Sequence, residues 1–88
     1  MKIVKEFILR EIAGENVLIP IGNTTQEFNG LITINKTAAF IWKNIEKSNS
    51  IEEITNLVIN KYEVDEESAS RDIQEFISIL DKANIIEV

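Results

Sequence analysis

The first third of the chain carries short apolar runs that are separated by polar or glycine-containing connections. Residues 7–12 and 17–21 are two such runs, rich in Ile, Leu and Val, and Gly14 lies in the connection between them. Runs of this length around a glycine-containing turn are typical of a β-hairpin. Pro20 cannot donate a ladder hydrogen bond, so we expect it near a strand end or on an edge of the sheet.

A third apolar run, Leu31-Ile32-Thr33-Ile34, consists largely of β-branched residues, which favour strands. A turn at 28–30 leads into this run, and the polar segment at 23–27 is interpreted as a loop. We therefore predict three antiparallel strands within residues 5–35.

Helical spacing replaces the strand pattern after Asn35, and no Gly or Pro occurs from there to the last residue given. Asn35, Ser50 and Asp65 each precede an amphipathic stretch and have side chains that favour the N-cap position. The predicted helices cover residues 36–47, 51–62 and 66–83. Asn84 suits the left-handed residue that often follows a helix, and residues 85–88 are expected to form a short extended tail.

The apolar residues of each predicted helix form a stripe on one face, which indicates packing against a shared core. In the second helix the stripe contains Ile51, Ile54, Leu57, Val58 and Tyr62. In the third and longest helix it contains Ala69, Ile73, Phe76, Ile77, Leu80 and Ala83. Ile79 lies to one side of that stripe, so the third helix has an additional apolar flank.

Strands followed by helices, with no dividing linker, are typical of an α+β fold, here as one domain over residues 1–88. Of the 88 residues 44% are hydrophobic, which is enough for one small core. A small antiparallel sheet needs a helix against one face to be stable. We therefore predict a winged-helix-like arrangement, a three-stranded antiparallel sheet followed by three α-helices.

The composition excludes several kinds of chemistry. The sequence contains no Cys and no His, so it lacks thiolate metal sites, Cys nucleophiles and the most frequent general base. The carboxylates near helix starts complement the helix dipoles, and we interpret them as surface charge and not as metal ligands. We expect no enzymatic activity, no bound metal and no cofactor.

The charge distribution argues against nucleic acids and membranes as partners. Nine basic and fifteen acidic residues give a net charge of −6, the wrong sign for binding a phosphate backbone. No apolar run approaches the roughly 18–20 residues that a membrane span requires. Charged residues interrupt the N-terminus too early for a signal peptide, so we expect a cytoplasmic location.

The predicted sheet leaves an edge to which a partner can add a strand. Three strands cannot close into a barrel, so at least one edge stays open. The third run, at 31–34, contains no charged residue. Such an edge, next to a helix with an extra apolar flank, suits an extended peptide that pairs with it. Two alternatives stay open: the edge pairs within a homodimer, or the tail at 85–88 covers it.

Two sequence blocks are similar to those of the PqqD-like family. The block from Phe28 to Trp42 resembles the family's strand-to-helix signature, and the second combines Tyr-Glu-Val-Asp at 62–65 with Asp-Ile-Gln-Glu-Phe at 72–76. The resemblance implies a RiPP recognition element, a winged-helix-like domain that binds the leader of a ribosomally made precursor peptide. Such a domain presents the leader to a separate modifying enzyme, often a radical SAM protein. We expect this chain to be a free-standing member with no activity of its own.

The resemblance also implies where the leader lies, as an added strand along the third strand and against the third helix. The implied peptide-binding residues are Gly30, Leu31, Ile32, Thr33 and Ile34 on the strand side and Asp72, Phe76, Ile79 and Ala83 on the helix side. The four helix residues recur at i, i+4, i+7 and i+11, a spacing that places them on one flank of the helix. Successive side chains of a strand point to opposite faces, so only one of the pairs Ile32/Ile34 and Leu31/Thr33 can meet the peptide's side chains. The alternative function is a winged-helix DNA-binding transcription regulator, which the acidity disfavours.

Overall fold

The computed structural model describes residues 1–28 and 30–87. The predicted turn at 28–30 and the predicted tail at 85–88 contain Asn29 and Val88, which lie outside the described residues. In the described part of the chain, no helix is both long and apolar enough to cross a membrane.

Three strands form an antiparallel sheet in the order β2-β3-β4, which confirms the predicted sheet and the α+β class. Their bounds are β2 Phe7–Ile12, β3 Glu15–Pro20 and β4 Ile32–Ile34. Ile12 pairs with Glu15, so the hairpin turn is shorter than the predicted connection and consists of Ala13 and Gly14. Ala13 and Gly14 both have positive φ, 51° and 81°, as the two central residues of a type I′ hairpin turn do. Pro20 ends its strand, as predicted.

Three long helices begin at the predicted N-caps. Their bounds are α2 Lys36–Asn44, α3 Ile51–Tyr62 and α4 Glu66–Lys82, and α4 is the longest. The side chains of Asn35, Ser50 and Asp65 each accept a hydrogen bond from the backbone N–H three residues further on. These acceptors satisfy N–H groups that a helix leaves without partners at its start.

The first predicted helix, 36–47, ends three residues earlier than predicted, at Asn44. The N–H groups of Lys47 and Ser48 bond to the carbonyl oxygens of Asn44 and Ile45, three residues back. The chain therefore tightens into a 3₁₀-type turn in place of a further α-helical turn.

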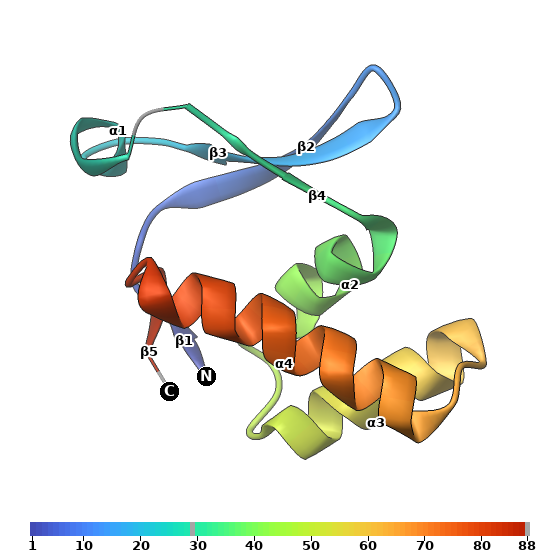
Figure 1. Ribbon diagram of the computed structural model, residues 1–88. Helices are drawn as coiled ribbons and strands as arrows, with labels where there is room; N and C mark the ends of the chain where they lie inside the picture. The colour runs from blue at the N-terminus through green and yellow to red at the C-terminus, as the bar shows by residue number, and fades with distance from the viewer. Residues whose placement is uncertain (29, 88) are drawn as a thin grey trace.

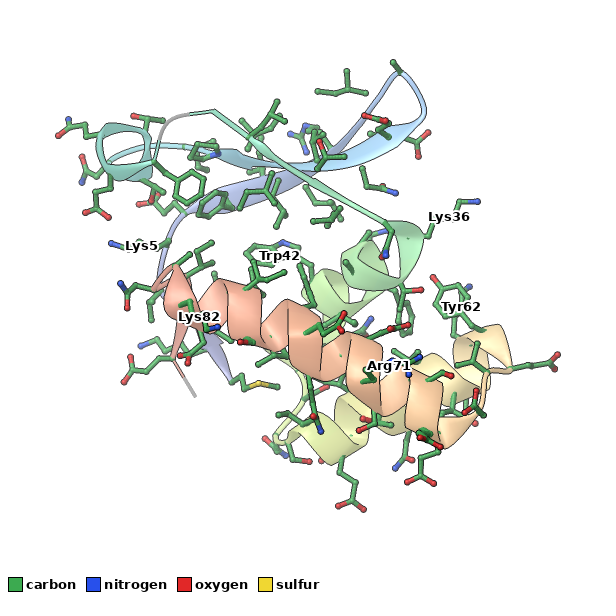
Figure 2. All side chains as sticks on the ribbon, in the orientation of Figure 1. Lys5, Lys36, Trp42, Tyr62, Arg71 and Lys82 are labelled. Carbon is green, nitrogen blue, oxygen red and sulfur yellow. The ribbon has the colours of Figure 1, made fainter. Side chains whose placement is uncertain are left out.

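The helices pack together on one face of the sheet (Figure 1). Register pairs Leu18 with Leu9 on one side and with Ile32 on the other, and these three side chains belong to the core or pack against it. Trp42 of α2 lies between sheet and helices (Figure 2), and its ring meets that of Phe7 edge-on with 6.3 Å between centroids. The predicted stripe of α4 is buried over Ala69, Ile73, Phe76, Ile77 and Leu80.

The prediction of the apolar stripe on α3 was wrong at one residue. Leu57 is exposed, whereas Thr55 is buried and donates its hydroxyl hydrogen to the carbonyl oxygen of Ile51. A threonine hydroxyl can bond to the preceding turn of its own helix, so Thr55 occupies an inward position without an unsatisfied polar group.

The segment at 23–27, predicted as a loop, contains a short helix, α1 (Thr24–Glu27). The described residues therefore form four helices and not three. Thr24 is buried, and its hydroxyl oxygen accepts a hydrogen bond from the N–H of Glu6 at 2.9 Å. This contact, from a residue 18 positions away, holds a segment whose local sequence is polar throughout.

Two terminal segments form a second small sheet that was not predicted. β1 (Lys2–Ile3) pairs antiparallel with β5 (Ile86–Glu87). After α4 the chain reverses at Asn84, whose φ of 58° is left-handed, as predicted. The N–H groups of Asn84 and Ile85 bond to the carbonyl oxygens of Asp81 and Leu80, the pattern of a Schellman motif.

Candidate functional site

One edge of the three-stranded sheet is open beside α4. β4 pairs with β3 along one side, from Leu18↔Ile32 to Asn16↔Ile34. Within residues 1–28 and 30–87, no strand pairs with its other side. The described part of the tail does not cover this edge, because Ile86–Glu87 pairs with β1. The unpaired backbone groups of β4 are therefore available to another chain.

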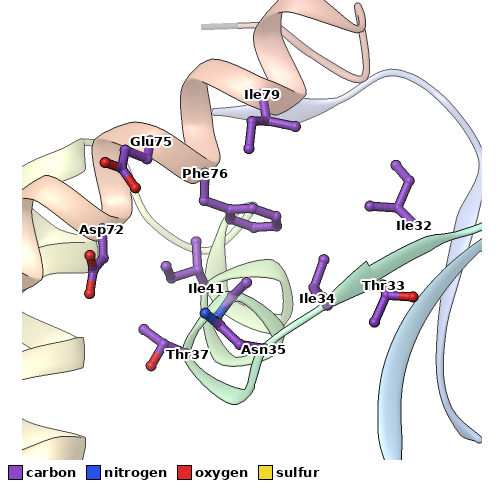
Figure 3. A pocket seen from close by; sticks show the side chains of 11 residues that line it. Ile32, Thr33, Ile34, Asn35, Thr37, Ile41, Asp72, Glu75, Phe76 and Ile79 are labelled. Atoms are coloured by element: carbon purple, nitrogen blue, oxygen red, sulfur yellow. The ribbon is translucent and has the colours of Figure 1, made fainter.

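A groove runs between this edge and α4, with the beginning of α2 as its floor (Figure 3). Its volume is about 280 Å³. The lining residues are Ile32, Thr33, Ile34, Asn35, Thr37, Ala38, Ile41, Asp72, Glu75, Phe76 and Ile79. Asn35 positions the floor, because its side chain caps α2 immediately after β4 and so turns the helix in beneath the strand.

The structure decides which side chains of β4 face the helices. Ile34 is buried in the core, and Ile32 packs against it. Thr33 is exposed, and its register partner is Val17. The side chains of both lie on the face of the sheet opposite to Ile32 and Ile34. Ile32 and Ile34 are therefore the pair whose side chains face the helices, and the backbone of β4 supplies the open edge of the groove.

Three predicted residues of α4 line the other wall. Phe76 is 7% exposed and belongs to the core, so its ring is the most deeply buried of the three in this wall. Ile79 is 55% exposed and projects from the same wall (Figure 3). Asp72 lies one helical turn before Phe76. The predicted spacing of these three along one flank of the helix matches their positions in the groove.

Three of the nine predicted site residues do not line the groove. Gly30 and Leu31 precede β4, and Leu31 is 51% exposed. Ala83 forms the C-cap of α4 and lies in a separate depression with Phe28 and Thr24. This depression also contains the ion pair between Lys5 and Glu27, which marks the far end of α4.

The sequence prediction omitted five residues that line the groove, namely Asn35 before α2, Thr37, Ala38 and Ile41 on α2, and Glu75 on α4. Helical spacing could have indicated Glu75, because it lies three residues after Asp72 and four before Ile79. The residues of α2 had no comparable signal. Ile41 belongs to the apolar stripe that also fills the core, and the crossing of α2 beneath the strand is a tertiary feature.

The chemistry of the groove suits an extended peptide better than a metal ion or a small molecule. In the described part of the chain, no group of three or more Asp or Glu side chains could hold a metal ion. The volume lies just below the roughly 300–1,000 Å³ of most small-molecule pockets. Apolar walls beside an unpaired strand provide both features of strand addition, backbone hydrogen bonds and sockets for alternate side chains.

These features define a small α+β domain with a groove between an edge strand and a helix. The family model described as Coenzyme PQQ synthesis protein D (PqqD) matches residues 15–86. The protein belongs to the PqqD family. The matched residues include β4, α2 and α4, so both walls and the floor of the groove lie within the family region.

A solved structure gives a second comparison. The structure of TbiB1 in complex with the TbiA(β) leader peptide matches this chain with a TM-score of 0.72 and 25% sequence identity. The match covers 99% of this chain and 95% of that chain. A comparison with curated protein sequences found no match.

Proposed function

We propose that this protein binds the leader of a ribosomally made precursor peptide as an added strand and presents it to a separate modifying enzyme. The observation that carries the proposal is the open edge of β4 beside the apolar groove on α4. Membership of the PqqD family supports it, as does the similarity to TbiB1, whose structure contains a leader peptide.

In this mechanism the backbone and the side chains have different roles. The N–H and C=O groups of β4 that point away from β3 pair with the peptide's backbone, which gives affinity without dependence on sequence. Every second side chain of the peptide then enters the groove between Ile32 and Ile79, where apolar contact gives specificity. The ring of Phe76 is packed into the core, so its position stays fixed when the peptide binds.

We assign the peptide contacts to the nine residues predicted from the sequence, in two groups. The groove-lining residues Ile32, Thr33, Ile34, Asp72, Phe76 and Ile79 contact the central part of the peptide. Gly30, Leu31 and Ala83 would contact its flanking part, beyond the Ile79 end of the groove. The distance along α4 from Asp72 to Ala83 is about 16 Å, equivalent to roughly five residues of an extended peptide.

The enzyme partner of this proposal is a radical SAM protein, and the domain itself has no catalytic role. Lack of Cys and His removes the side chains that most often act as nucleophile or general base. Presentation needs only a bound conformation, in which the leader is held and the segment to be modified extends away from the domain. A cytoplasmic location is part of the proposal.

A titration followed by NMR tests the site. The ligand is a synthetic leader, about ten to twenty residues long, taken from a short peptide encoded beside this gene. Amide signals of residues 30–34 and 72–83 should shift, and the outward amides of β4 should gain protection from exchange. Shifts confined to β2 or α3 would contradict the proposal, because those elements lie outside the groove.

A further inference from the structure

The two ends of the groove differ in chemistry. Asp72 of α4 lies at the end next to Thr37, with Glu75 nearby, whereas Ile79 projects at the end nearer Ile32 (Figure 3). Among the described residues that line the groove, Asp72 and Glu75 carry charge and none is basic. The groove is therefore apolar at one end and acidic at the other.

Neither carboxylate is neutralised by an ion pair in the described part of the chain. The ion pair found there joins Lys5 and Glu27, on the far side of Ala83. Arg71, the base nearest to Asp72 in sequence, acts electrostatically on Asp65. Arg71 and Lys82 line a neighbouring depression that Glu75 also borders, but neither forms a salt bridge with Glu75 in the described part of the chain. Asp72 and Glu75 are exposed, so both are accessible to a cation from outside the chain.

The geometry sets the spacing between the two ends. Asp72 and Ile79 are seven residues apart on α4, which is about 10 Å at 1.5 Å per residue. An extended peptide covers this distance in about three residues, and side chains that face the same wall recur every second residue. Two peptide side chains that reach the two ends are therefore about two to four residues apart.

We propose that the peptide bound in this groove carries Lys or Arg at the Asp72/Glu75 end and an aliphatic residue, two to four positions away, at the Ile32/Ile79 end. This inference rests on the proposed function and specifies the class of leader. The aliphatic residue removes apolar surface of Ile32 and Ile79 from water. The basic residue pairs with carboxylates that form no ion pair within the described part of the chain, and it excludes acidic leaders by repulsion.

The protein's overall charge requires a matched control. A net charge of −6 attracts any basic peptide at long range, whatever the groove does. The test variant is Asp72→Asn with Glu75→Gln. The control, Glu67→Gln with Asp81→Asn, removes the same charge from the same helix at two exposed positions that do not line the groove. A third variant, Ile79→Asp, disables the apolar end.

The probe is a displayed library of random peptides about twelve residues long, selected on each purified protein. Peptides selected on the unsubstituted protein and on the control should be enriched in a basic residue two to four positions from an aliphatic one. On Asp72→Asn/Glu75→Gln the aliphatic preference should remain and the basic preference should disappear. For one selected peptide, each carboxylate should contribute up to about fivefold in affinity, and less at high salt.

The outcomes separate this inference from the proposed function. Aliphatic peptides that depend on Ile79 but have no basic preference overturn the charge inference and leave the groove as the binding site. A basic preference lost equally in the control variant also overturns it, because long-range attraction then accounts for the selection. If no selected peptide depends on Ile79, the proposed groove itself is wrong.

Discussion

Ile79 and Leu80 are neighbours on α4, yet Ile79 is 55% exposed and Leu80 is completely buried. The difference follows from the helical period, because adjacent residues point about 100° apart. Leu80 faces the core, whereas Ile79 faces the groove beside β4. One helix therefore supplies both the packing that holds the sheet in place and a wall of the candidate site.

This division predicts opposite effects of truncating the two side chains. Leu80→Ala should lower the free energy of unfolding by about 2–5 kcal/mol, because it removes buried methyl groups and leaves a cavity. Ile79→Ala should change it much less, since Ile79 is already 55% exposed to solvent. Urea denaturation of both variants measures the difference. Equal losses would mean that the groove wall is part of the core.

The sequence predicted the elements that depend on local patterns. The hairpin, the third strand and the three long helices follow from apolar spacing together with the N-caps Asn35, Ser50 and Asp65. The elements that were missed depend on contacts between distant residues. α1 is held by the hydrogen bond from Glu6 to Thr24, and β1 has a partner only because the chain returns at Ile86.

The candidate site shows the same limit. Helical spacing was enough to place Asp72, Phe76 and Ile79 on one flank, and all three line the groove. The pattern of the strand left its orientation open, because both pairs of alternate residues contain an aliphatic side chain. The pairing of Ile32 with Leu18, a core residue, decides it. Register of this kind is a tertiary property that a single strand does not encode.

The N-cap of α4 predicts a pH-dependent contribution to stability. Hydrogen bonds from the side chain and backbone of Ser68 lower the pKa of Asp65 below its ordinary value of 3.8, and Arg71 adds to the effect. A lowered folded-state pKa stabilises the fold above the unfolded-state value, and this contribution is lost as the pH falls through the folded-state pKa. Asp65→Asn should therefore be less stable than the unsubstituted protein at neutral pH, and the gap should narrow in acid.

Thermal unfolding of both proteins between neutral pH and pH about 3 measures this gap. The other carboxylates are the same in both proteins, so the difference in stability between the two proteins reports on Asp65 alone. Glu11→Gln is the control, because it removes one negative charge from an exposed position on β2, away from any helix start. A gap for Asp65→Asn that stays constant with pH would show that the charge does not stabilise the helix.

Charge on α4 predicts that the protein does not bind DNA. The exposed acidic residues of this helix include Glu66, Glu67, Asp72, Glu75 and Asp81, and its bases are Arg71 and Lys82. A helix with this balance repels phosphates in a major groove. In a gel-shift assay at low salt, even proteins that bind DNA non-specifically slow its migration. With this protein, the DNA should migrate as free DNA only. A protein–DNA complex that becomes weaker as salt is added would favour the transcription-regulator alternative.

The most direct prediction concerns a charge placed in the groove. Ile79→Asp puts a carboxylate at the apolar end of the groove, one helical turn from Glu75, where a bound peptide would have to desolvate it. Affinity for a leader peptide should fall by roughly 1–3 kcal/mol, or about 5- to 150-fold. Isothermal titration calorimetry measures this change, and the thermal transition should survive because Ile79 is largely exposed.

Leu57→Asp is the matched control for this variant. Leu57 is likewise an aliphatic residue in the interior of a helix, 39% exposed, but it lies on α3 and does not line the groove. It adds the same charge to the protein, so it corrects for any long-range effect on peptide affinity. The control should bind the leader as the unsubstituted protein does. If Ile79→Asp also keeps full affinity and a normal thermal transition, the leader does not bind between β4 and α4.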